Sequence, residues 1–128
     1  MRKGSIMYRI KVYGEFSAAH RIDGYAGDCS QLHGHNWRVC IAISTEGLDE
    51  LGLSCDFREA KAILHGVLKE LDHRLLNDHP WLEGGNPSSE RLAKTIFTKL
   101  KESLSPRMKL DSVEVFESER SSVEYFEE

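Results

Sequence analysis

Two stretches in the first part of the chain alternate between apolar and polar residues, which is the pattern of a half-buried β-strand. In residues 8–16 the apolar positions are Tyr8, Ile10, Val12 and Phe16. In residues 36–43 they are Trp37, Val39, Ile41 and Ile43. Because successive strand side chains point to opposite faces of a sheet, each set predicts one buried face. The residues between the two stretches include Gly24 and Gly27 among aspartates and predict a loop.

Two later stretches have apolar residues at helical spacing, and each begins beside a residue that commonly caps a helix. Asp56 is expected to cap the first helix, with Glu59 three residues later in the position of a capping box. The expected buried stripe of this helix is Phe57, Ala60, Ile63, Leu64, Val67, Leu68 and Leu71. Asn86 is expected to cap the second helix and Pro87 to occupy its first turn, with Pro106 as the stop. The expected stripe of the second helix is Leu92, Ile96, Phe97, Leu100 and Leu104.

The last part of the chain predicts a β-hairpin, with short strands at residues 112–116 and 122–126 and a turn at residues 117–121. The predicted order of elements is therefore β-β-α-α-β-β. Strands that run in pairs, with both helices between the pairs, favour an α+β architecture in which a four-stranded antiparallel sheet carries two helices on one face. A chain of 128 residues is long enough for one core, so residues 1–128 are expected to form a single domain.

The composition is that of an ordinary globular protein, with 40% hydrophobic and 30% charged residues and a net charge of −4. A nucleic-acid-binding surface needs clustered Lys and Arg, and no such run occurs, so no direct nucleic-acid partner is expected. After the basic residues Arg2 and Lys3, no apolar stretch has the length of a signal peptide or a membrane span, so neither is expected. The three cysteines are odd in number and share no paired spacing, which favours reduced thiols and a cytoplasmic location.

Three histidines and one cysteine lie close together in the sequence and predict a metal site. On an extended strand His33 and His35 point to the same face, so both imidazoles can reach one ion. His20 can join them if the intervening loop folds back, and Zn²⁺ is the default metal for imidazole ligands. Cys29 lies four residues before His33 and leaves two possibilities open. Three histidines leave a coordination position for water or substrate, as in catalytic zinc sites, whereas Cys29 as a fourth ligand would close a structural site.

Several other polar residues have an ordinary interpretation beside a functional one. The pair Asp72-His73 follows the first helix, where a histidine meets the negative end of the helix dipole. If Cys29 is a reactive thiolate near a cation, however, a Cys, His and Asp set is a recognised means of moving protons. Glu90 fits the first turn of a helix, and Glu117 fits a solvated hairpin. The remaining cysteines and histidines are expected to be packing residues (Cys40 and Cys55) and surface residues (His65 and His79).

A series of short motifs occurs in the order found in the 6-pyruvoyl-tetrahydropterin synthase superfamily, and together the motifs span nearly the whole chain. They are His20, Cys29-Ser30-Gln31-Leu32-His33-Gly34-His35, Asp56-Phe57, Leu71-Asp72-His73, Leu76-Asn77-Asp78, Asn86-Pro87-Ser88-Ser89-Glu90 and Val115-Phe116-Glu117-Ser118. The chain most resembles the bacterial and archaeal branch of this family, the 6-carboxy-tetrahydropterin synthases. The short gap between Cys29 and His33 resembles that branch, because pyruvoyl-forming relatives carry a longer insert there.

The resemblance implies a tunnelling fold, in which four-stranded sheets of several subunits join into a barrel, usually as a homo-oligomer of one trimer or two stacked trimers. The implied zinc ligands are His20, His33 and His35. The implied catalytic set is Cys29, Asp72 and His73. In this arrangement Cys29 faces the Asp-His pair of a neighbouring subunit. Glu90 would anchor the pterin ring, and Glu117 matches a second acidic position in the active site.

The implied reaction is the zinc-dependent conversion of 7,8-dihydroneopterin triphosphate to 6-carboxy-5,6,7,8-tetrahydropterin, on the deazapurine route to queuosine. Two relatives catalyse neighbouring reactions, namely triphosphate elimination to 6-pyruvoyl-tetrahydropterin and side-chain cleavage for folate synthesis. The cleaving relative typically has a glutamate in the region of Cys29, where this chain has Asp28 as the neighbouring acid. A non-catalytic module that binds zinc or a pterin is the alternative from a different class.

Overall fold

The computed structural model describes residues 7–128, so Arg2 and Lys3 lie outside the described residues. Two long strands, β1 (Met7–His20) and β2 (His33–Glu46), pair antiparallel along their whole length and contain both alternating stretches. Each strand extends further towards the connecting loop than the alternation predicts, because the register pairs His20 with His33. The small residues at that end have no apolar alternation, but their backbones still pair. The extension places all three candidate zinc ligands on paired strands.

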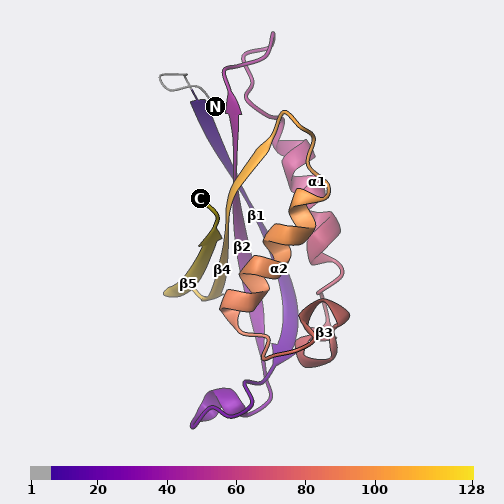
Figure 1. Cartoon of the computed structure of the whole chain (residues 1–128), viewed down its shortest axis with the longest axis vertical. Coiled ribbons are helices and arrows are strands. Elements are labelled where there is room, and N and C mark those ends of the chain that lie inside the picture. The colour runs from indigo at the N-terminus through magenta and orange to yellow at the C-terminus, as the bar shows by residue number, and fades with distance from the viewer. Residues whose placement is uncertain (1–6) are drawn as a thin grey trace.

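Residues 7–128 form one sheet of five strands in the order β3-β1-β2-β4-β5 (Figure 1). The predicted C-terminal hairpin is present as β4 (Lys109–Ser118) and β5 (Ser121–Phe126). Its strands are longer than predicted and include Glu117, Ser118 and Ser121, which were expected in the turn. The predicted four-stranded antiparallel sheet is wrong in one respect, because β3 (Arg74–Leu75) adds a fifth strand that runs parallel to β1. A strand of two residues has no periodicity that a sequence could reveal. It forms beside a long-range backbone hydrogen bond, from His73 N–H to the Ser17 carbonyl at 2.6 Å.

The first helix, α1 (Phe57–Leu68), begins where it was predicted. The Asp56 side chain caps it by accepting a hydrogen bond from Arg58 N–H at 2.8 Å. The buried members of its predicted stripe are Ala60, Leu64, Val67, Leu68 and Leu71. Phe57 was expected to be buried with them and is 56% exposed, because it is the first residue of the helix and precedes the turns that pack on β1.

The second helix, α2 (Ser89–Lys101), has a different cap from the predicted one. Ser88 occupies the cap position, and its hydroxyl accepts a hydrogen bond from Arg91 N–H at 3.2 Å. The side chain of Asn86 instead hydrogen-bonds the backbone of Asp23, which lies far away in the sequence. The buried members of the predicted stripe are Leu92, Ile96, Phe97 and Leu100. Leu104 lies beyond the end of the helix and is half-buried.

Both helices cover the same face of the sheet, with α1 packed on β1 and α2 on β4 and β5 (Figure 1). The core between the layers contains the apolar positions of β2 together with the helical stripes. The loop between β1 and β2 carries a short 3₁₀ helix, η1 (Asp28–Ser30), and projects past the end of the sheet opposite to Met7 (Figure 1). None of the helices within residues 7–128 has the length and apolar character needed to cross a membrane.

His79 was expected at the surface and is instead 3% exposed. It lies between two 3₁₀ helices, η2 (Leu76–Asp78) and η3 (Pro80–Leu82). Its Nδ1 accepts a hydrogen bond from Trp81 N–H at 3.1 Å, so Nε2 carries the proton and donates to the Glu70 carbonyl at 2.8 Å. A neutral histidine with both nitrogens paired to the backbone can be buried at little cost, and these partners cannot be read from sequence spacing.

Candidate metal centre and its surroundings

Three imidazoles converge at one end of the sheet, at the point where β1 and β2 leave the core. His33 and His35 lie on the same face of β2, as the alternation predicts, and His20 ends β1 directly opposite His33. The ring centroids are 4.6 Å apart for His20 and His33, 4.7 Å for His33 and His35, and 5.4 Å for His20 and His35. One ligand atom from each histidine and one from Glu117 all lie within 4.8 Å of one another. This spacing suits a single bound cation.

Backbone carbonyls determine which imidazole nitrogens are available to bind a metal. His20 Nδ1 lies 2.8 Å from the Pro87 carbonyl, and His33 Nδ1 lies 2.7 Å from the Gln31 carbonyl. Because a carbonyl only accepts hydrogen bonds, each Nδ1 carries the proton and each Nε2 has a free lone pair. His20 Nε2 is buried and has no hydrogen-bond partner within residues 7–128. A buried acceptor without a partner is costly, and a cation at this point would remove that cost.

His35 and Glu117 provide the other half of the cluster. His35 Nε2 lies 2.9 Å from Glu117 Oε1, but the two atoms are not aligned as a hydrogen bond, and the nitrogen is another buried atom without a partner in the described chain. Burial lowers the pKa of His35 below its ordinary value of 6.5, the Glu117 carboxylate opposes this, and the two neighbouring imidazoles lower the pKa further. The neutral imidazole, which is the metal-binding form, is therefore favoured. The Ser89 hydroxyl donates to Glu117 Oε2 at 3.0 Å and orients the carboxylate.

The donor set of this cluster fits Zn²⁺. Imidazole nitrogens and a carboxylate are ordinary zinc ligands, and the hydrogen bonds from Nδ1 to backbone carbonyls are the outer contacts that orient such ligands. The place of Glu117 next to the histidines has no direct signal in the sequence, because β4 reaches β2 only through the sheet.

The three cysteines differ in their surroundings. Cys29 lies in η1 and is half-buried, and its carbonyl accepts a hydrogen bond from Ile22 N–H at 2.7 Å. Among residues 7–128 the group that can share one ion contains Glu117 and does not contain Cys29. Cys40 and Cys55 are buried, as expected for packing residues, and burial raises the pKa of both thiols above the ordinary value of 9.0. Of the three thiols, that of Cys29 is therefore the most accessible to solvent.

The Asp72-His73 pair is held at the edge of β1 by the backbone of Ser17. Ser17 N–H donates to Asp72 Oδ1 at 2.9 Å, and Asp72 Oδ2 lies 2.8 Å from His73 Nδ1. The hydrogen bond from Ser17 lowers the pKa of Asp72 most, and the contact with His73 lowers it further. His73 has a φ of 58°, which is uncommon for a residue with a side chain, and its ring is 83% exposed. The pair is thus a fixed, ionised carboxylate that orients an outward-facing imidazole.

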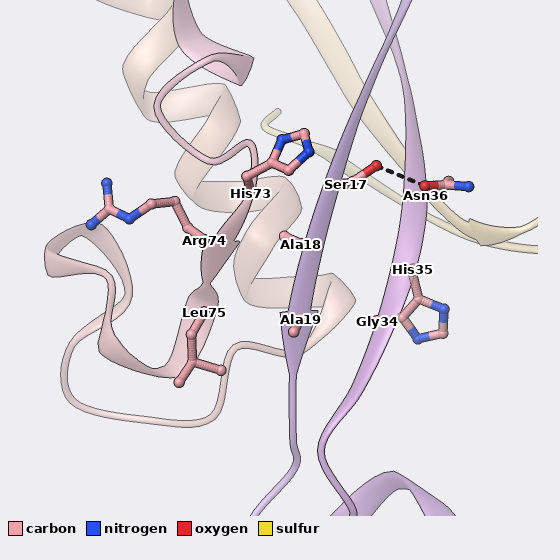
Figure 2. A pocket seen from close by; sticks show the side chains of 9 residues that line it. All are labelled: Ser17, Ala18, Ala19, Gly34, His35, Asn36, His73, Arg74 and Leu75. Atoms are coloured by element: carbon pink, nitrogen blue, oxygen red, sulfur yellow. Dashed lines mark hydrogen bonds between the residues drawn. The ribbon is translucent and has the colours of Figure 1, made fainter.

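An open depression of about 510 Å³ is lined by residues of β1, β2 and β3 together with His73. Its lining includes His73, Ser17, Asn36 and His35. Figure 2 shows His73 on one side of β1, and Asn36 and His35 on β2, with the Ser17 hydroxyl hydrogen-bonded to Asn36 between them. Cys29 is absent from the lining of this depression, and no hydrogen bond or ion pair in the described chain joins it to Asp72 or His73.

Glu90 lies in the first turn of α2, and its side chain is exposed. Its neighbour Ser89 is the residue of this turn that faces the metal cluster, through Glu117. A single chain thus brings together the three histidines and Glu117, keeps Asp72 and His73 as a separate pair, and leaves Cys29 and Glu90 outside both groups.

The sequence of the chain is similar to those of known tetrahydropterin synthases and of an aldolase. The family model described as 6-pyruvoyl tetrahydropterin synthase matches residues 9–128. The chain is 41% identical over 122 residues to 6-carboxy-5,6,7,8-tetrahydropterin synthase of Synechocystis, covering 90% of this chain and 92% of that protein. It is 32% identical over 122 residues to dihydroneopterin monophosphate aldolase of Pyrococcus furiosus, covering 95% and 96% of the two proteins.

The solved structures extend the likeness to three dimensions. Caenorhabditis elegans 6-pyruvoyl tetrahydropterin synthase superposes with a TM-score of 0.85 at 25% sequence identity, covering 97% of this chain and 98% of that one. The matched fold is the α+β arrangement of a sheet with two helices on one face. Since the sequence match and the superposition both run through the strands that carry the three histidines, the chain belongs to the 6-pyruvoyl tetrahydropterin synthase family.

Proposed function

We propose that the protein is a zinc-dependent lyase that converts 7,8-dihydroneopterin triphosphate and one water molecule to 6-carboxy-5,6,7,8-tetrahydropterin, acetaldehyde and triphosphate. The observation that carries the proposal is the group of three imidazoles, in which two buried nitrogens have no partner within residues 7–128. The identity to the Synechocystis protein of that name supports the choice of reaction. The product would serve queuosine synthesis in the cytoplasm.

The three histidines would hold the zinc ion and leave a coordination position for the substrate side chain. When bound, zinc supplies Lewis acidity that stabilises negative charge on a substrate oxygen. Cys29 would act as the base that removes a side-chain proton. His73 would carry protons, and Asp72 would keep the imidazole oriented, as the hydrogen bond from Ser17 already orients Asp72. Acid-base assistance of this kind typically contributes about 10² to 10⁴ in rate.

Two carboxylates would hold the pterin. Glu117 lies 2.9 Å from His35 and is oriented by Ser89, so a ring that binds it would lie directly beside the metal. Glu90 is proposed as the ring anchor, accepting hydrogen bonds from the amino and NH groups of the pterin. Its exposed position on α2 would place such an anchor at the rim of the site.

The active site would be completed by a second copy of the chain. Within residues 7–128 of one chain no hydrogen bond or ion pair joins Cys29 to the Asp72-His73 pair, and the His73 ring is 83% exposed. Both groups would meet if the Asp72-His73 edge of one subunit faced the Cys29 loop of the next. The sheet has β3 and β5 at its outer edges, and edge strands have unpaired backbone groups that can join sheets of neighbouring subunits. A trimer, or two stacked trimers, would close such sheets into a barrel.

Product analysis tests the proposed reaction. The zinc-loaded protein should convert dihydroneopterin triphosphate to a product with the mass of 6-carboxy-tetrahydropterin, and acetaldehyde should be trapped as a hydrazone. A chelated sample and a His33→Ala variant should form neither. A pyruvoyl product, or a hydroxymethyl-dihydropterin as in side-chain cleavage, would move the protein to the corresponding neighbouring activity. Zinc and pterin binding without any product would support the non-catalytic module.

Mixing of inactive variants tests the shared active site. Cys29→Ala and His73→Ala oligomers should each be nearly inactive while retaining zinc. After dissociation and reassembly of a mixture, some interfaces combine an intact Cys29 with an intact His73, and about a quarter of wild-type activity should return, since one ordered pairing in four is intact. Subunit exchange proven by mass spectrometry without any recovery would place the catalytic groups within one chain.

A further inference from the structure

Two asparagine side chains are hydrogen-bonded to the backbone that follows His20. Asn77 Oδ1 accepts from Arg21 N–H at 2.9 Å, and Asn77 Nδ2 donates to the Arg21 carbonyl at 3.0 Å. Asn86 makes the same pair of bonds to Asp23, with both distances 2.9 Å. A side-chain amide has the donor and acceptor of a peptide group, so each asparagine replaces one residue of a neighbouring strand.

The two asparagines continue a line of contacts along one edge of β1. In an extended strand the backbone groups of alternate residues point to the same edge. Along this edge Ser17 bonds the Asp72-His73 segment, and the residue two positions later pairs with β3. Arg21 is the next position of the same alternation, directly beyond the end of β1, and Asp23 lies in the turn that follows. The side chains of Asn77 and Asn86 thus extend the pairing edge where no third strand is present in the described chain.

This extended edge supports the loop that carries Cys29. Ile22 lies between the two residues bound by asparagine, and its N–H donates to the Cys29 carbonyl at 2.7 Å, which closes the loop. Asn86 is followed by Pro87, whose carbonyl contacts His20 Nδ1 at 2.8 Å. One short segment therefore holds both the loop and a histidine of the metal cluster.

We propose that Asn77 and Asn86 are positioning residues, which hold the backbone of residues 21–23 just beyond β1 and thereby fix Cys29 relative to the three histidines. The inference rests on the proposed function for the catalytic role of Cys29. The position of the loop itself does not depend on that role. Both asparagines bond backbone groups through their side-chain amides and would act on Cys29 through the backbone.

Thiol labelling of Asn77→Ala and Asn86→Ala variants tests the proposal, on zinc-loaded protein kept well below its unfolding temperature. Alkylation of Cys29 by iodoacetamide, followed by peptide mass spectrometry, should become about fivefold faster or more, because the loop opens locally. Cys40 and Cys55 in the same samples should react as slowly as in wild type, since both are buried. The kcat for the pterin substrate should fall about tenfold or more with KM nearly unchanged, because a displaced base slows turnover more than it weakens binding.

Asp49→Ala is the matched control. Asp49 Oδ1 accepts two backbone hydrogen bonds, from Leu51 and Leu53 at 2.9 Å each, in a loop outside the proposed site. This variant should leave Cys29 labelling and kcat unchanged. Wild-type labelling of Cys29 in both asparagine variants, or equal acceleration in Asp49→Ala, would overturn the proposal.

Hydrogen exchange on the wild-type protein provides a test that does not depend on a variant folding. The amides of Arg21 and Asp23 should exchange about tenfold more slowly than that of Gly24, since side-chain carbonyls cover them. Equal exchange rates would show that the hydrogen bonds from the two asparagines to Arg21 and Asp23 are open in solution, and would overturn the proposal. If the wild type does not convert the pterin substrate, the proposed function fails, while labelling and exchange still decide the role of the asparagines.

Discussion

The helix-side face of β2 has two halves that follow the same alternation. They differ in whether their side chains find all their packing and hydrogen-bond partners within the described chain. The residues of the apolar half are Trp37, Val39, Ile41 and Ile43, each 0% exposed. The polar half consists of His33 and His35, which meet His20 and Glu117 instead of a helix core. The apolar half is completed by close packing against α1 and α2, whereas the polar half has buried nitrogens without a partner in the described chain. Periodicity thus selects the face, and residue chemistry determines whether that part of the face is complete without a ligand.

Removal of an imidazole should have the largest effect on the polar half. His35→Ala should weaken zinc binding by more than about a hundredfold, because loss of even an outer contact to a ligand commonly costs 10 to 100-fold. The sheet should remain folded, since the apolar half does not depend on the metal. Competition titration with a zinc-binding dye measures the affinity, and far-UV circular dichroism checks the fold. His65→Ala, at an exposed helix position, is the control, and equal zinc affinity in both variants would contradict the site.

A cavity in the apolar half should produce the opposite result. Ile41→Ala should lower the free energy of unfolding by about 2–5 kcal/mol, because a fully buried side chain leaves a cavity. Zinc affinity of the folded protein should stay near that of wild type. Urea unfolding with chelator present gives the stability, and dye competition gives the affinity. A large loss of zinc affinity would show that the two halves are coupled and not independent.

Removal of the Ser89 hydroxyl, which orients Glu117, should have a smaller effect than either of these changes. Ser89→Ala removes the hydrogen bond to Glu117 Oε2 and should weaken pterin binding about tenfold, because the carboxylate proposed to hold the ring is no longer oriented. Calorimetric titration of the zinc-loaded protein with the pterin substrate measures this change. Ser103→Ala, at an exposed position after α2, should leave the pterin affinity unchanged. Unaltered pterin affinity in Ser89→Ala would mean that Glu117 does not hold the ring.

The smallest effect is expected at the far end of the molecule, at the cap of α1. Hydrogen bonds from the Arg58 backbone and side chain lower the pKa of Asp56 below its ordinary value of 3.8. The folded state therefore favours the carboxylate, and this contribution is complete above the ordinary value and is lost as the pH falls through the folded-state value. Asp56→Asn should be slightly less stable than wild type at pH 7 and equally stable near pH 2. Urea midpoints at both pH values measure the difference, and a constant difference would exclude a role for the charge.

Local patterns were sufficient wherever an element is defined by near neighbours in the chain. The alternation in β1 and β2, the helical spacing in α1 and α2, and the cap at Asp56 all follow from residues within a few positions. The common face of His33 and His35 belongs to the same class, because it needs only a strand. These features are local, and their physical cause is visible in the order of residues.

Features that depend on distant partners were missed or could only be guessed. Asn86 was expected to cap α2, but it bonds Asp23, and Ser88 takes the cap position. His79 was expected to be exposed, but backbone groups near it satisfy both of its nitrogens and allow burial. The two residues of β3 pair with β1 next to the point where the Asp72-His73 segment binds Ser17, which is far away in the sequence.

The metal site combines local features with features that depend on distant partners. Its imidazoles, their metal chemistry and the common face of two of them can be read from residue types and spacing. The pairing of His20 with His33, the carbonyl that leaves His20 Nε2 free and the arrival of Glu117 beside His35 arise from contacts between remote segments. Such contacts depend on loop closure and sheet register, which no local pattern encodes. The tertiary structure therefore decides which of the possible ligands meet in one site.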